Sequence, residues 1–148
     1  MTMPKPRFRL ATLLRLRESA RDECRARLAE AHKADQEIID QLTRLGLEQQ
    51  QVQEECRKAA GPGDVDLDRL VEAHRYVVSL RTREEELRQR RQTLAAEIQQ
   101  RRQALLKADQ DVQMLEKLRD RRLERHRLEE ERQEAKQIDE AALQAAVS

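Results

Sequence analysis

The sequence predicts an all-α protein, a long antiparallel two-helix coiled-coil hairpin in which the C-terminal helix projects beyond the pair. Three observations predict it: a composition rich in helix formers, one strong break inside the chain, and a heptad pattern of apolar residues that stops before the chain does. Of 148 residues, 40% are charged and 1% are aromatic. The large aromatic side chains that contribute much of a globular core are therefore almost absent, and the composition is typical of a coiled coil.

The helix breakers divide the chain into two helices. Gly61-Pro62-Gly63 is the strongest internal turn signal, and Asp64 and Asp66, directly after it, have side chains that cap helix N-termini. A short turn between two helices favours antiparallel packing. We therefore expect a single coiled-coil domain over residues 1–148, with helices at about 8–60 and 65–145 and a turn at 61–64.

An apolar stripe follows alternating steps of four and three residues along both helices. From Leu10 to Ala59 eleven of fifteen positions are apolar, and from Leu70 to Leu115 eleven of fourteen are apolar. A disordered chain has no reason to keep this register, whereas a left-handed coiled coil requires it. The next seven positions of the second stripe are all polar, so we expect the seam to end at Leu115.

The heptad register also predicts which residues face one another. Counted outward from the turn, facing residues have numbers that add to about 126, so Leu10 falls near Leu115 and Asp35 faces Arg91. We predict an ion pair between these two charged groups, the alternative being that both stay solvated at a loosely packed layer. Because the first helix runs out where the second loses its seam, the residues from roughly Leu118 onward are expected to project beyond the hairpin.

The chain lacks the patterns that catalysis or cofactor binding requires. His32, His74 and His126 are too far apart in the sequence to share a ligand spacing. Cys24 and Cys56 fall on the first stripe, where small buried residues are expected. The glycines form no phosphate-binding loop. We therefore expect no enzyme activity, no cofactor and no metal.

Two segments of the chain are strongly basic. Residues 1–17 carry five basic side chains and no acidic one, and five arginines gather between Arg119 and Arg127. Each segment is either a solvated helix surface or a contact for a partner. The net charge of +1 argues against nucleic acid as that partner. The longest apolar run near the start, residues 10–14, is too short for a signal peptide or a membrane span.

Both ends of the chain carry stretches typical of one protein family. At the start, residues 8–18 combine an aromatic residue, basic residues and leucines. At the end, residues 115–122 contain a Leu-x-x-Leu pattern, and residues 131–141 close on Asp-Glu-Ala. These stretches resemble the flagellar export protein FliJ family. Residues 40–100 share only the heptad character, and His126 stands where many members have an aromatic residue.

The resemblance implies a non-enzymatic stalk of the flagellar type III protein export apparatus, with a role in flagellum biogenesis and chemotaxis. It implies a cytoplasmic protein that is peripherally associated with the inner membrane and has no membrane span of its own. The implied partners are the hexameric export ATPase, the cytoplasmic part of the export gate and export chaperones, with no nucleic acid. By analogy, the partner-binding surface is expected at the paired ends, on Phe8, Arg9, Leu13, Leu16, Arg17, Arg119, Arg121, Arg122, Arg125, Arg127 and Arg132.

Two alternatives remain open at the level of the sequence. The equivalent stalk protein of a virulence type III secretion system shares fold and mechanism with the flagellar one. A structural scaffold that self-associates through the seam is the other alternative, and it predicts a dimer or filament. The Gly-Pro-Gly turn argues against the scaffold, because a continuous dimeric rod has no use for a break there.

Overall fold

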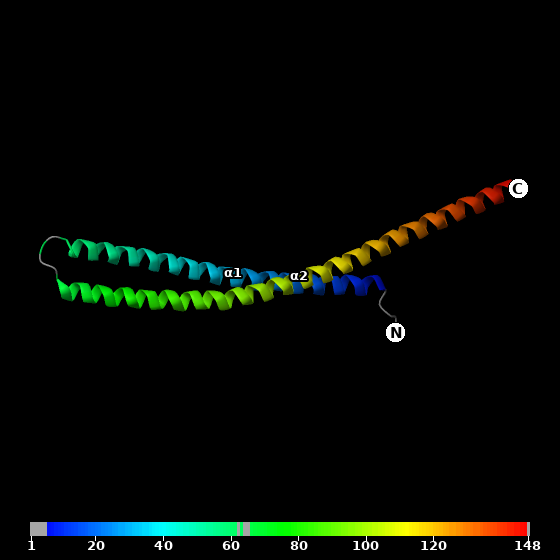
Figure 1. The fold of residues 1–148 in the computed structure, drawn as a ribbon. Helices are drawn as coiled ribbons and strands as arrows, with labels where there is room; N and C mark the ends of the chain where they lie inside the picture. The colour runs from blue at the N-terminus through cyan, green and yellow to red at the C-terminus, as the bar shows by residue number, and fades with distance from the viewer. Residues whose placement is uncertain (1–5, 62, 64–65, 148) are drawn as a thin grey trace. The chain divides into compact units, whose positions relative to one another are not determined.

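The computed structural model describes residues 6–61, 63 and 66–147. Two helices, α1 (Pro6–Ala59) and α2 (Leu67–Val147), account for nearly all of them (Figure 1). The predicted all-α fold of two long helices packed against each other is confirmed. Of the expected turn at 61–64, Pro62 and Asp64 lie outside the described residues, and so does the capping role expected for Asp64. The single domain over residues 1–148 stays a prediction.

Local chemistry explains where the helices begin and end. Pro6 occupies the first position of α1, where its missing N–H costs nothing. Near the end of α1, the Gly61 N–H donates to the Lys58 carbonyl at 3.4 Å, a tightened last turn. Asp66 precedes α2, and its Oδ1 accepts from the Arg69 backbone N–H at 3.3 Å. Asp66 is therefore the N-cap of α2, as expected from its position after the turn.

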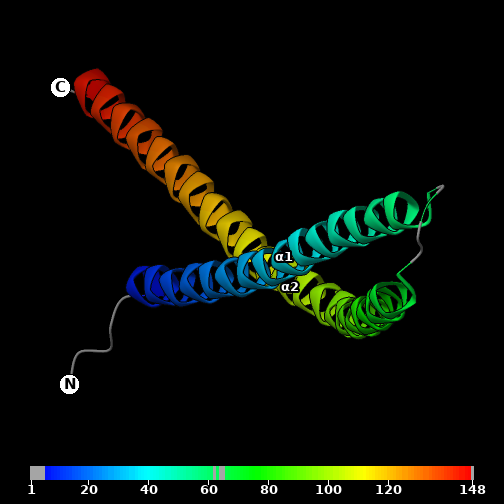
Figure 2. The ribbon, with the colours of Figure 1, turned by 90° about the vertical axis from the view of Figure 1, so that its left-hand side faces the viewer.

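The contacts group the chain into two units, which are described separately. The unit formed by residues 24–104 contains the end of α1 and the start of α2, which lie at the same end of it in both views (Figures 1 and 2). Its buried apolar side chains come from both helices, and all of them lie on the predicted stripes. They are Ala31 and Leu45 of α1 and Leu80 and Ile98 of α2.

Polar side chains interrupt this seam at defined layers. Arg91 Nε donates to Asp35 Oδ1 at 3.0 Å, so the predicted ion pair is confirmed. Gln49 Nε2 donates to Glu84 Oε2, also at 3.0 Å. Hydrogen bonds from Arg88 and from Gln49 lower the pKa of the Glu84 carboxyl below its ordinary value. These stripe positions are therefore satisfied by polar partners rather than by apolar packing.

The other unit combines the start of α1, up to Glu23, with α2 from Leu105. Its buried apolar side chains, again on the predicted stripes, are Leu10, Leu14 and Val112. Arg17 Nη1 lies 3.8 Å from Asp111 Oδ2 at the next layer. Every described residue from 117 to 147 is exposed. The apolar seam therefore ends where the stripe predicts, at Leu115, and Glu116 is the last described residue of α2 that is not exposed.

Candidate partner-binding surface at the chain ends

The unit that holds both chain ends places most of the predicted partner-binding residues at its surface. Arg9 and Arg17 are exposed on α1, as are Leu13 and Leu16, which are large apolar side chains in contact with water. The side chain of Phe8 lies outside the described part of the structure. On α2, the predicted arginines are all exposed: Arg119, Arg121, Arg122, Arg125, Arg127 and Arg132.

A groove of about 530 Å³ lies between the first turns of α1 and the part of α2 from Arg119 to His126. From the predicted set it includes Arg119 and Arg122, which therefore lie close to the first turns of α1. The remaining predicted arginines of α2 do not line it. Its lining comes from α1 through Leu10, Ala11, Leu14, Arg15 and Glu18, and from α2 through Arg119, Arg122, Leu123 and His126.

Several of these lining residues were not predicted from the sequence. Leu123 is an exposed apolar side chain just past the end of the seam, and Ala11 follows the buried Leu10 on α1. The sequence pattern could have indicated three of the lining residues, because Arg119, Arg122 and His126 are the next three positions of the second stripe after Leu115. A stripe that turns polar still keeps one face of the helix toward its neighbour.

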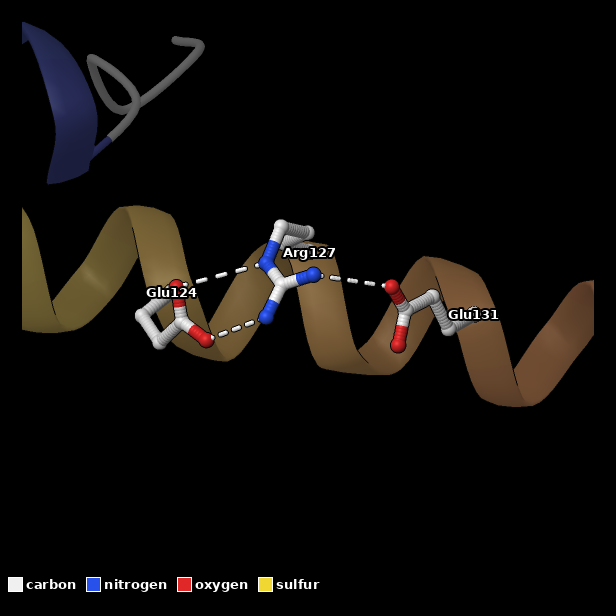
Figure 3. A network of polar contacts seen from close by, with 3 residues as sticks. All are labelled: Glu124, Arg127 and Glu131. Atoms are coloured by element: carbon white, nitrogen blue, oxygen red, sulfur yellow. Dashed lines mark hydrogen bonds and ion pairs between the residues drawn. The ribbon is translucent and has the colours of Figure 1, made fainter.

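The arginines of α2 differ in how far the helix already engages them. Arg127 donates to Glu124 through Nε at 3.3 Å and through Nη2 at 2.6 Å, and Nη1 donates to Glu131 at 2.9 Å (Figure 3). This hydrogen bonding lowers the pKa of the Glu124 carboxyl below its ordinary value and raises that of the Arg127 guanidinium. The Arg127 guanidinium therefore already binds carboxylates of its own helix.

Weaker contacts occur nearby. Arg119 Nε lies 3.6 Å from Asp120 Oδ1, and His126 Nδ1 lies 3.5 Å from Glu130 Oε1. About half or more of each of these four side chains is exposed to solvent. Such pairs therefore add little to stability. The side chains of Arg119 and His126 are therefore still exposed to solvent on the groove side of α2.

Within the described residues, no group of three or more His, Cys, Asp or Glu side chains is placed to hold a metal ion. None of the helices described is long and apolar enough to cross a membrane. Cys24 and Cys56 are both free thiols, half-buried along the seam.

The comparison with known protein families decides the identity of this arrangement. A family model described as "Flagellar FliJ protein" matches residues 6–148. The chain belongs to the FliJ family. The resemblance predicted from the chain ends is thereby confirmed over essentially the whole chain. No curated protein and no solved structure matches the chain. Membership in the FliJ family implies a component of the flagellar export apparatus, the first of the two secretion systems considered from the sequence.

Proposed function

We propose that this FliJ-family chain is a non-enzymatic stalk of the flagellar export apparatus. In this proposal the two helices form an antiparallel hairpin whose paired ends bind the hexameric export ATPase. The second helix projects beyond the pair, and the stalk couples the ATPase to the cytoplasmic part of the export gate and to export chaperones. The protein then works in the cytoplasm, held at the inner membrane only through the apparatus.

The pairing of charged residues between the helices is the observation that carries the proposal. Asp35 contacts Arg91 in one unit, and Arg17 contacts Asp111 in the other. In the first of these units Gln49 also contacts Glu84, so the later residue of α1 meets the earlier residue of α2. Such an order supports an antiparallel hairpin in the unit formed by residues 24–104, and a chain that buries its own seam has less reason to form a parallel dimer.

The exposure of the last part of α2 supports the projecting segment. All described residues from 117 to 147 are exposed, and the stripe positions from Arg119 to Glu140 are polar. A helix of this kind is held only weakly by exposed charge pairs such as Arg127 with Glu131. Its surface is thus left for contacts with other proteins, and we assign the partner-binding role to the eleven residues expected from the sequence.

Size-exclusion chromatography with light scattering, run with and without the export ATPase, tests this proposal. We expect a monomer that co-elutes with the ATPase and raises its rate of hydrolysis. Reversing the charge of Arg121, Arg122 and Arg125 to glutamate should weaken the co-elution, because cationic contacts across an interface are lost and replaced by repulsion.

A matched control reverses three exposed arginines of α2 in the unit formed by residues 24–104: Arg81, Arg90 and Arg102. This variant carries the same change in net charge and should co-elute like the wild type. If both triple variants bind the ATPase equally well, the chain ends are not the contact. A stable dimer that ignores the ATPase would instead favour the self-associating scaffold.

A further inference from the structure

The groove between the first turns of α1 and residues 119–126 of α2 has an apolar floor. Leu10 and Leu14 of α1 are buried in the seam, and their outer edges form part of the lining. Leu123 of α2 reaches the same groove with 48% of its surface exposed. Since Leu123 lies beyond the end of the seam, this apolar surface stays in contact with water in the isolated chain. Covering it would contribute favourable free energy in proportion to its area.

The lining residues fall on one face of each helix. Arg119, Arg122, Leu123 and His126 stand at positions i, i+3, i+4 and i+7 of α2. Figure 2 shows the first turns of α1 and the yellow-to-orange part of α2 separating from one another within this unit. The space between two diverging helix faces suits one further helix, which can place its own i, i+3, i+4 and i+7 side chains between them.

The charges around the floor select the kind of helix. Three lining side chains are arginines, Arg15, Arg119 and Arg122, and one is a carboxylate, Glu18. A segment with carboxylates along its flanks complements this excess of positive charge, whereas a basic segment is repelled. Arginine is also the residue best suited to hold carboxylates in two-point contacts.

We propose that this groove binds one amphipathic α-helix of a partner protein, with leucine-like side chains on its inner face and Asp or Glu along its flanks. The inference rests on the proposed function, since it names the class of segment that the ATPase-binding end of the chain would accept. The bound helix would complete a three-helix layer over Leu10, Leu14 and Leu123.

The test uses the full-length chain and two synthetic peptides of about 20 residues, long enough to form a helix. Both peptides carry the same leucine heptads, and they differ only in having Glu or Lys at the flanking positions. Fluorescence anisotropy of the labelled peptides measures their affinities. We expect the Glu peptide to bind at least about tenfold more tightly than the Lys peptide. Equal affinities, or no saturable binding of either peptide, would overturn the proposal.

Two variants show whether the peptide occupies the groove. Ala11→Trp fills the groove without touching the seam, because Ala11 is exposed and lines it. Ala20→Trp is the matched control, since Ala20 is exposed on the same helix in the same unit and is not part of the lining. Ala11→Trp should weaken binding of the Glu peptide about tenfold or more, and Ala20→Trp should leave it unchanged. Equal effects of the two variants would refute the assignment.

The remaining outcomes separate the groove from the proposed function. Binding of the Glu peptide without binding of the ATPase would support the groove as a helix-binding site and refute the ATPase as its partner. Binding of the ATPase without binding of either peptide would refute the groove as a helix-binding site and leave the proposed function standing. If light scattering shows a wild-type dimer that becomes monomeric with Ala11→Trp, the occupant is a second copy of the chain, and the proposal of a partner helix is overturned.

Discussion

Truncation of Leu80 measures most directly how much the buried seam contributes to the free energy of unfolding. Leu80 is 1% exposed and is the largest fully buried side chain of the unit formed by residues 24–104. Leu80→Ala removes three buried carbon atoms, at about 0.8 kcal/mol each. A residual cavity adds to this cost, but the neighbours in a two-helix seam are half-buried and relax easily. We therefore expect the free energy of unfolding to fall by about 2–3 kcal/mol.

The assay is urea unfolding followed by circular dichroism at the helix band, with the midpoint and slope fitted together. Leu47→Ala is the control, because Leu47 lies in the same unit and is 56% exposed. The change in helix propensity is identical in the two variants, so the difference between them isolates burial. We expect Leu47→Ala to cost about 1 kcal/mol or less. Equal shifts of the two midpoints would mean that the stripe is not where the stability resides.

Two further predictions concern charge. In a double-mutant cycle, Asp35→Ala and Arg91→Ala should show a coupling energy of about 0.5–1 kcal/mol. The value is small because the two side chains are 21% and 48% exposed, so solvent screens the pair. Additive effects of the two substitutions would mean that the ion pair has no energetic role. NMR titration of labelled glutamate should give Glu124 a pKa below its ordinary value, rising toward that value in Arg127→Ala. Since the folded pKa is lowered, the pair stabilises the helix above the ordinary glutamate value, and this contribution is lost as the pH falls through the folded value; an unchanged pKa in the variant would refute the cause.

The heptad pattern predicts the packing of this chain well because burial in a two-helix seam depends on one variable, the rotation of each side chain about its helix axis. Every residue described as buried, from Leu10 to Val112, lies on one of the two stripes. The loss of burial after Glu116 follows from the same cause. A polar stripe offers no apolar surface for a neighbour to cover.

The same pattern does not predict the partners of long polar side chains. Arg101 donates to the backbone carbonyl of Arg27, which is not a stripe position, and Gln49 donates to Glu84. The stripe predicts neither of these contacts. Long side chains choose among several acceptors through rotamers that a periodic pattern does not encode. The groove was missed for a related reason, because Leu123 acquires its role only from the neighbouring first turns of α1.

The charged seam positions explain how a chain with few buried residues keeps one register in the proposed antiparallel hairpin. A slip of one heptad in one direction would place Asp35 opposite Ile98, and a slip in the other would place it opposite Glu84. The first leaves a half-buried carboxylate against an apolar side chain, and the second sets two carboxylates together. Only the observed pairing with Arg91 satisfies Asp35. Leucine and alanine layers tolerate such slips far better, so the ion pair contributes to register more than to stability.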